Sequence, residues 1–232
     1  MKPVDLNQEL RGNAYPGRGI VIGQSADGKQ AVVAYFIMGR SVNSRNRIFA
    51  EEPDGIRTEA ADPAKMEDPS LIIYHPVRQM GRGLIVTNGD QTDTIRDFLE
   101  KGLPFEQALR TREFEPDGPN WTPRISGLLS PDGSYKLSIL KAGSAEGAPC
   151  LRFFYEYEKA VPGAGHFIST YEGFGSPLPS FSGEPVAVEV PELGAAALAE
   201  RIWAALDGDN RVSLYVCVDG EEVIINKYGE EA

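Results

Sequence analysis

Short hydrophobic runs separated by glycine- and proline-rich turns make up most of the chain. The clearest run is residues 31–38 (AVVAYFIM), which carry no charge and are long enough for a strand buried on both faces. Residues 19–23 form a shorter apolar run before it. The intervening Ala26-Asp27-Gly28-Lys29 is typical of a hairpin connection, so the two runs are predicted to be neighbouring strands.

The same pattern predicts further strands downstream. Asp219-Gly220 lies between two of them, and this dipeptide is typical of a two-residue type I′ turn. One more strand is expected at the end of the irregular segment FEPDGPNWTPRISGLL. The other predicted strands cover residues 71–77, 83–87, 134–140, 151–158, 166–171, 186–190, 211–218 and 222–227.

Three segments show helical signals instead. In TNGDQTDTIRDFLEKG an apolar stripe begins at Ile95, and Gly102 ends the helix. Pro104 opens a second, short helix in PFEQALRTR. Residues 192–206 are rich in alanine and leucine and are closed by Asp207-Gly208, so they are predicted to form the third helix.

Hairpins dominate this pattern, and strand–helix–strand alternation is rare. About ten strands and three helices favour an α+β fold with antiparallel sheets and helices on the outside. Residues 50–70 are acidic and proline-rich, and we expect a surface loop there because no change in character follows them. Without a boundary or a repeat, residues 1–232 are expected to form a single domain.

The composition is that of an ordinary globular protein, with 41% hydrophobic and 25% charged residues. No apolar run approaches the roughly 20 residues of a membrane span, and MKPVDLNQEL lacks an apolar signal region, so a cytoplasmic protein is expected. Cys150 and Cys217 each lie in an apolar run and are expected to be reduced and buried. His75 and His166 have no second nitrogen or sulfur ligand nearby, so no metal site is expected.

Positive charge is concentrated near the start of an acidic chain. The formal net charge is −11, but residues 11–48 hold six basic residues and one acid. Arg40, Arg45 and Arg47 lie in the loop after residues 31–38, among hydroxyl and amide side chains. Such a patch favours a small anionic ligand over a polyanion, which the remaining acidic surface would repel. The alternative is a solvated basic turn.

Several spaced phrases between about residues 13 and 185 resemble the archaeal-type inosine monophosphate cyclohydrolase family. They are NAYPGRGIVIG, AYFIMGRSVNSRNR, VTNGDQTDTI, PNWTPRI and PSFSGEP. The resemblance implies a four-layer αββα sandwich like that of the N-terminal nucleophile hydrolases. Met1-Lys2-Pro3 offers no N-terminal nucleophile, so the likeness carries over the fold and not that mechanism.

The activity that the resemblance implies is closure of the purine ring of 5-formamidoimidazole-4-carboxamide ribonucleotide, which releases water and gives IMP. Both reacting groups sit on one imidazole, so the enzyme must hold the reactive rotamer, stabilise the developing oxyanion and move two protons. Neither a metal nor an organic cofactor is needed. The expected partner is a purine ribonucleotide, with no nucleic acid or membrane, and a homo-oligomer is compatible with the sequence.

Two other classes of function stay open. A nucleotide-monophosphate-binding protein would keep the arginine loop without the chemistry. An amidohydrolase on the same fold would need a nucleophile or a metal, and the sequence offers neither. Turnover of the formamido ribonucleotide distinguishes the first of these from a cyclohydrolase.

Arginines and hydroxyls are the candidates for the substrate's 5′-phosphate, which offers the strongest charged contact. Arg45 is expected to form a charge-assisted, bidentate contact with it. Arg18 is predicted to lie on the same sheet as the arginine loop, either at the same end of that sheet or at the opposite end. Arg47 is either a further phosphate ligand or a surface residue. The phosphate-binding candidates are Arg18, Arg40, Ser41, Ser44 and Arg45.

The remaining candidates come from three motifs and one tyrosine. The polar side chains of TNGDQTD have two possible roles. They cap a helix, or they bind the substrate's carboxamide and accept a proton. The glutamate of PSFSGEP is a candidate general base if it is buried. Tyr15 is a candidate phenol donor to the formyl oxygen. The catalytic candidates are Tyr15, Asn88, Asp90 and Glu184, and the further substrate-binding candidates are Thr92, Asp93, Asn120, Thr122 and Arg124.

Overall fold

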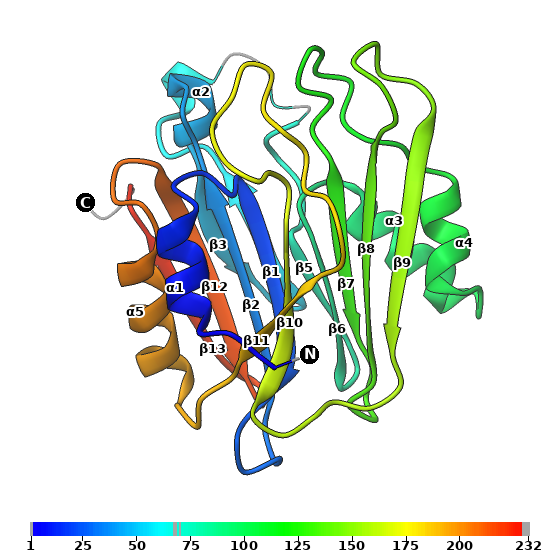
Figure 1. Ribbon diagram of the computed structural model, residues 1–232, viewed down its shortest axis with the longest axis vertical. Helices are drawn as coiled ribbons and strands as arrows, with labels where there is room; N and C mark the ends of the chain where they lie inside the picture. The colour runs from blue at the N-terminus through cyan, green and yellow to red at the C-terminus, as the bar shows by residue number, and fades with distance from the viewer. Residues whose placement is uncertain (1, 67–68, 70, 229–232) are drawn as a thin grey trace.

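Two β-sheets lie face to face in the computed structural model, which describes residues 2–66, 69 and 71–228 (Figure 1). One sheet has six strands in the order β11-β10-β1-β2-β12-β13, and the other has seven in the order β3-β4-β5-β6-β7-β8-β9. Every neighbouring pair in both sheets is antiparallel. The prediction of a mixed fold with mostly antiparallel sheets and few helices is therefore confirmed.

The described residues contain more elements than the sequence pattern predicts. They form thirteen strands, five α-helices and one short 3-10 helix. In chain order these are α1 (Leu6–Gly12), β1 (Arg18–Gln24), β2 (Ala31–Met38), α2 (Val42–Arg45), β3 (Ile48–Glu52), β4 (Gly55–Glu59), η1 (Pro63–Lys65), β5 (Val77–Met80), β6 (Gly83–Thr87), α3 (Gln91–Glu100), α4 (Phe105–Arg110), β7 (Arg124–Leu129), β8 (Tyr135–Ala142), β9 (Cys150–Tyr157), β10 (Ala164–Ser169), β11 (Val186–Glu189), α5 (Ala195–Ala205), β12 (Arg211–Val218) and β13 (Glu221–Asn226).

The hairpins predicted at the two ends of the chain are confirmed. β1 pairs with β2 through the turn at residues 25–30, and β12 pairs with β13 through Asp219-Gly220. Asp219 has φ 49° and Gly220 has φ 88°. Positive φ at both central residues is the requirement of a type I′ turn, whose twist matches the flanking strands. β2 then lies between β1 and β12 in the middle of the six-stranded sheet, which explains its uncharged sequence.

The two sheets share one apolar core. Ile20 and Ile22 of β1, with Tyr35 of β2, pack toward Val86 and other residues of the seven-stranded sheet. A Cβ at Gly127 of β7 would lie 2.7 Å from the Ile22 Cδ1 atom, so a side chain there would force Ile22 to shift. The glycine therefore lets β1 and β7 approach closely where the sheets meet.

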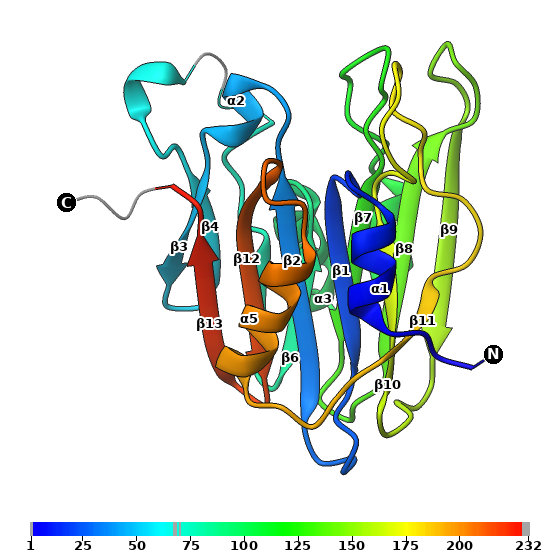
Figure 2. The same cartoon turned by 60° about the vertical axis from the view of Figure 1, so that its left-hand side comes forward.

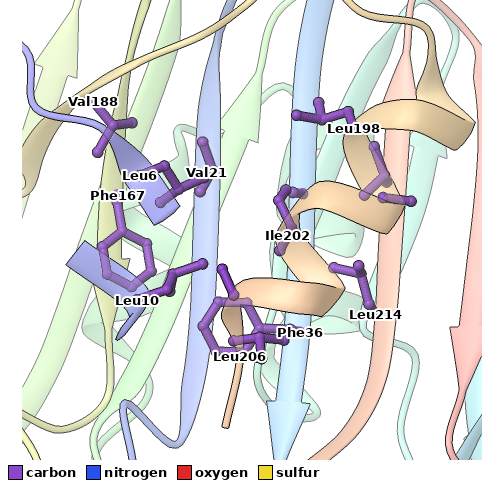
Figure 3. Close-up of a cluster of buried hydrophobic side chains, with 14 of the residues drawn as sticks. Leu6, Leu10, Val21, Phe36, Phe167, Val188, Leu198, Ile202, Leu206 and Leu214 are labelled. Atoms are coloured by element: carbon purple, nitrogen blue, oxygen red, sulfur yellow. The ribbon is translucent and has the colours of Figure 1, made fainter. Parts of the chain in front are cut away.

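Helices cover the outer face of each sheet (Figures 1 and 2). On the six-stranded sheet, α1 and α5 bury a second core in which Leu6 and Leu10 meet Val21, and Ile202 meets Leu214 (Figure 3). On the seven-stranded sheet, α3 and α4 bury a third core around Ile85, Ile95, Phe105, Ala108, Leu109 and Leu140. Each of these four helices thus buries one apolar face against a sheet.

Two predictions about residues 48–82 are wrong. The acidic stretch expected to be a loop begins with the β3–β4 hairpin, because β3 is an edge strand and tolerates charge on its solvent side. Residues 71–76 are not a strand, since Thr58 Oγ1 donates to the Ile72 carbonyl and the Tyr74 amide binds Thr58 instead of a ladder partner. Of the predicted strand 71–77, Val77 alone lies in a strand, as the first residue of β5.

Other expectations fail in smaller ways. Helix α1, capped by Asp5, was not predicted, since it has only seven residues. Cys217 is buried as expected, but Cys150 is only partly buried because β9 is an edge strand. Arg18 pairs with Ile37 at the end of β2 that leads into Gly39, so it lies at the same end of the sheet as the arginine loop.

Candidate functional site

Loops from distant parts of the chain meet at one end of the two sheets, the upper end in Figures 1 and 2. Arg40 Nη1 donates to the Gly175 carbonyl at 3.1 Å, and the Leu178 amide donates to Asn120 Oδ1 at 3.1 Å. The loops around residues 40, 120 and 175 are therefore fastened to one another. Arg18, at the start of β1, points into this region between the sheets, on the same strand face as Ile20.

Three ionisable side chains are removed from solvent here without a counter-ion in contact. Arg47 is 1% exposed and Glu115 is 3% exposed, while Arg18 is half-buried. Within residues 2–66, 69 and 71–228, no ion pair of 4.0 Å or less includes any of the three. The Nε atom of Arg18 is buried and has no hydrogen-bond partner among these residues. Buried charges are normally paired, so this group is the candidate for a functional site.

The three groups act on one another electrostatically. Burial raises the pKa of Glu115, and the Arg18 and Arg124 guanidiniums offset only part of that rise. Burial opposes the charge on Arg18, but the Glu115 carboxylate and nearby tyrosines outweigh it and raise the pKa of Arg18. Burial, and then the positive charge of Arg18, lower the pKa of Arg47. A carboxyl group with a raised pKa beside two guanidiniums is suited to proton transfer near an anion.

Arg47 is held by the loop that carries it. Its Nε donates to the Ser44 carbonyl at 2.9 Å, and its Nη2 donates to the Met38 carbonyl at 3.3 Å. The sequence left Arg47 open between a ligand and a surface residue, and the structure places it inside the fold. Its position next to Arg18 makes two cations available in one buried region.

Four tyrosines surround these charges. Tyr35 and Tyr74 join their hydroxyls at 2.9 Å, and both rings are buried. Tyr171 and Thr122 share a 2.6 Å hydrogen bond, and Thr122 Oγ1 in turn donates to the Asp117 carboxylate. Thr122 has one hydroxyl proton, so Tyr171 must be the donor to Thr122. Burial raises the pKa of Tyr171 to about 12, which keeps it protonated.

Tyr15 is the fourth tyrosine. Its ring is 3% exposed and stacks on Tyr171 and on Phe174, with ring centroids 6.1 Å and 5.3 Å away. The Arg40 guanidinium lies 5.9 Å from its centroid. In the described part of the chain its hydroxyl has no hydrogen-bond partner, so the Tyr15 proton remains available to a ligand. Arg40 itself is exposed, and toward the described residues it uses one of its five N–H donors.

The other arginine-loop candidates are occupied by the loop itself. Arg45 Nε donates to the Gly39 carbonyl at 2.9 Å, and Arg45 Nη2 donates to Asn210 Oδ1 at 3.2 Å. Ser41 and Ser44 form a reciprocal capping box at the start of α2. These three side chains therefore shape the loop that carries Arg40 and Arg47.

The TNGDQTD residues form a separate buried network at the start of α3. The Asn88 amide binds the Pro123 carbonyl at 2.9 Å and accepts from the Ile125 amide at 2.8 Å. Thr92 is fully buried and bonds to Thr87 Oγ1 at 2.6 Å. This network joins the end of β6 to the start of β7 and supports the loops of the site.

Asp90 and Arg124 form an ion pair in the same network. Arg124 Nη1 lies 2.7 Å from Asp90 Oδ1 and donates to Gln91 Oε1 at 2.6 Å, and Arg112 pairs with the other Asp90 oxygen. Burial raises the pKa of Asp90, but the two arginines outweigh it and lower that pKa. Asp90 is therefore held as a carboxylate. Its side chain makes no capping hydrogen bond to the backbone of α3 in the described residues.

Two candidates lie away from the buried charges. Asp93 accepts from Arg78 Nε at 3.3 Å and bonds to His75 Nδ1 at 2.8 Å. Arg78 follows the core residue Val77, so this cluster faces α3 on the outer side of the sheet. Glu184 is exposed, so the condition for its role as a general base, burial, is not met.

Because the Asn88 amide is fully buried and bonded, we expect Asn88→Ala to lower the free energy of unfolding by about 1–3 kcal/mol. The loss arises because the Pro123 carbonyl and the Ile125 amide lose their partner. Urea denaturation measures it, and the exposed Gln107→Ala in α4 should change stability by less than about 0.5 kcal/mol. Equal stabilities for the two variants would contradict a structural role for Asn88.

Glu115 and Tyr74 were not identified from the sequence. Glu115 lies in FEPDGPNW, where proline, glycine and a second acid are typical of an exposed loop. Tyr74 lies in a segment that was predicted to be a strand. The one available signal is that Glu115 is flanked by Phe114 and Pro116 and followed by Trp121, which is an apolar content unusual for a solvated loop.

The described residues contain no group of three or more histidine, cysteine, aspartate or glutamate side chains placed to hold a metal ion. None of the helices in residues 2–66, 69 and 71–228 has the length and apolar composition needed to cross a membrane.

Comparison with known proteins identifies similar sequences. The sequence model of a family described as IMP cyclohydrolase-like protein matches residues 15–222. An IMP cyclohydrolase of Halobacterium salinarum is 33% identical over 158 residues, which cover 65% of this chain and 76% of that protein. Those of Methanopyrus kandleri and Methanococcus aeolicus are each 31% identical, and the matches cover 57% and 52% of this chain and 72% and 61% of those proteins.

Proposed function

Because the chain belongs to the family of IMP cyclohydrolase-like proteins, we propose that it is an IMP cyclohydrolase of purine biosynthesis. As such it is a hydrolase of the class that acts on cyclic amidines, working here in the dehydrative direction. The single observation that carries the proposal beyond the relatives' names is the buried group of Arg18, Arg47 and Glu115 without contacting counter-ions. An anionic substrate that undergoes proton transfer would explain why the fold maintains it.

The protons of the reaction are assigned to Glu115 and Tyr15. The carboxamide nitrogen attacks the formyl carbon, and the formyl oxygen gains two protons before it leaves as water. The carboxamide and formamido nitrogens each lose one proton, and these restore the two donors. Tyr15 has an unengaged hydroxyl to donate to the developing oxyanion, and Glu115 has a raised pKa suited to deliver a proton. Tyr171 donates to Thr122 instead, so we give it the role of packing against Tyr15.

The guanidiniums are assigned to the substrate's negative charge. Arg18, coupled to Glu115, is placed at the reacting end, where it stabilises the oxyanion. Arg40 stands at the exposed rim, donates one hydrogen bond to the part of the chain that the structure describes, and is placed on the 5′-phosphate. We no longer assign the phosphate to Arg45, because its guanidinium is bonded to the loop. Asn88 and Asp90 lose their catalytic roles because their side chains are already paired. Glu184 loses its role because it is exposed. Arg124, Asn120 and Thr122 support these loops.

Three coarser features belong to the same proposal. The two sheets with helices outside each of them support a four-layer αββα sandwich of the N-terminal nucleophile hydrolase type. We treat residues 1–232 as a single domain acting in the cytoplasm. The substrate is a small purine ribonucleotide, and no cofactor takes part in the proposed steps.

The direct test is incubation of the purified protein with 5-formamidoimidazole-4-carboxamide ribonucleotide, with IMP formation followed by ultraviolet absorbance. Formation well above the buffer rate is expected. Tight IMP binding with no turnover above that rate would contradict the enzyme proposal and favour a nucleotide-binding protein.

Arg40 and Arg45 can be separated by comparing IMP with inosine, which lacks the phosphate. Arg40→Ala should weaken IMP binding by about 10- to 150-fold, the equivalent of about 1.5–3 kcal/mol for a charge-assisted contact, and leave inosine binding unchanged. Arg45→Ala should weaken both ligands to a similar extent, since it holds Gly39 and Asn210. Calorimetry on the two variants decides between them. A loss confined to IMP in Arg45→Ala would return the phosphate role to Arg45.

A further inference from the structure

Strand β9 is a regular strand at an open edge of its sheet. It pairs with β8 through eight consecutive residue pairs, Cys150 to Tyr157, without a bulge, and β8 is its only neighbour in the seven-stranded sheet. In Figure 2 it stands at the right-hand end of that sheet. It contains no proline. Edge strands usually carry a bulge, a proline or a covering segment, because their free N–H and C=O groups pair readily with another strand.

The inner face of β9 also exposes apolar side chains. Leu151 is 37% exposed and Phe153 is 40% exposed. They share this strand face with Tyr155 and Tyr157, which follow further along β9 and pack against the core between the sheets. The edge thus combines unpaired backbone groups with an apolar surface, as an interface requires.

The sequence of β9 is complementary to itself in one antiparallel register. A two-fold axis through Phe154 places Phe153 opposite Tyr155 of the other copy, on the apolar face. On the opposite face it places Arg152 opposite Glu156, twice by symmetry. Cross-strand aromatic pairs and opposite charges are the pairs that stabilise a sheet.

The alternative registers are poorer. Residues that lie directly opposite each other in the two copies of β9 must have their side chains on the same face of the joined sheet. The two-fold axis can therefore pass only through a residue, and alternative registers differ by whole residues along the strand. An axis through Phe153 sets Arg152 opposite Phe154, and an axis through Arg152 sets two arginines against each other. An axis through Tyr155 also pairs aromatic rings and sets Arg152 opposite Glu158, which lies beyond β9, but it places Phe154 opposite Glu156. Within β9, the register centred on Phe154 matches charge on one face and aromatic rings on the other.

The charged residues have partners already that leave room for this pairing. Glu156 is 64% exposed and lies 3.2 Å from Lys136 Nζ. Arg152 donates to the Arg112 carbonyl at 2.7 Å and lies 3.8 Å from Glu113 Oε1, and its buried Nε has no partner in the described part of the chain. A second copy would extend the Lys136–Glu156 pair by one cation.

We propose that β9 is a dimer interface, in which two copies of this chain join their seven-stranded sheets edge to edge with Phe154 on the two-fold axis. The apolar strip of Leu151 and Phe153 is then covered by Tyr157 and Tyr155 of the second copy. The interface is separate from the proposed catalytic group and does not depend on the function assigned to it.

Light scattering during gel filtration of the full chain tests the dimer. The expected mass is twice 25.3 kDa. Phe153→Lys should raise the dimer dissociation constant by about tenfold or more, because it places a charge in the covered strip. Val161→Lys is the matched control, since Val161 is 62% exposed and lies outside β9. A monomer at every concentration, or a Phe153→Lys variant that associates like the control, would overturn the proposal.

Charge exchange tests the register. Arg152→Glu and Glu156→Arg should each weaken the dimer by about tenfold, and the double variant should recover it. In a Cys150→Ser background, Phe154→Cys should form a disulfide-linked dimer on oxidation, because this residue faces its own copy. Glu156→Cys should not, since its copies lie about 13 Å apart along the strand. A double variant as weak as the single ones, or the reverse pattern of cross-linking, would refute this register.

Discussion

Replacing Glu115 with glutamine should lower kcat by about 100- to 10,000-fold, the range typical of a lost general acid or base. Glutamine keeps the size and hydrogen-bonding shape of the side chain but cannot transfer a proton. Glu115 is the one carboxyl group in the buried cluster whose pKa is raised, chiefly by burial. Initial rates of IMP formation measure the effect, and Glu113→Gln, whose side chain is 69% exposed two positions away, is the control.

The pH dependence gives this prediction a second readout. If Glu115 delivers a proton, the wild-type rate should fall as pH rises through its raised pKa, and this fall should be absent in Glu115→Gln. A persistent fall at the same pH would assign the proton to another group.

Loss of activity in Glu115→Gln should not arise from unfolding. Since the pKa of Glu115 in the folded protein is raised above the value of 4.5 expected when unfolded, its protonation stabilises the fold at low pH. That stability is lost as pH rises through the folded-state pKa. Glutamine stays neutral, so the variant should be at least as stable as the wild type at neutral pH, which thermal denaturation can check.

Replacing Arg18 with glutamine should lower kcat by about 100- to 1,000-fold, as expected for a lost oxyanion-stabilising donor. Arg18 is also the first among the charges that lower the pKa of Glu115 against the effect of burial. Its removal should therefore move the fall in rate to higher pH. Arg201→Gln, on the outer helix α5 and 45% exposed, should change neither quantity.

The two readouts of Arg18→Gln test different parts of the argument. A lower kcat without a shift in the pH profile would mean that Arg18 binds substrate but is not coupled to the titrating acid. A wild-type rate would remove Arg18 from the mechanism altogether. Both outcomes are compatible with a folded protein, because Arg18 forms no ion pair within the described residues.

The sequence by itself determined the regular core of the fold. Residues 31–38 and 211–218 were predicted with the bounds that the structure gives, because a mainly apolar run of this length between turn residues is typical of a buried strand. The Asp219-Gly220 turn was predicted from the dipeptide alone, since few other residues accept positive φ at both positions. Sequence also located the arginine loop, because its charge contrasts with the acidic remainder.

Tertiary structure alone decided which charges are buried. Arg45 and Arg47 are nearly equivalent in sequence, yet Arg45 braces Gly39 and Asn210 while Arg47 enters the space beside Arg18. Asn210 is 165 residues from Arg45, and no local pattern reports such a contact. Glu115 is buried near Arg18 and Arg47, which are distant from it in the sequence. A burial produced by loops far apart in sequence leaves no periodicity for sequence reasoning to detect.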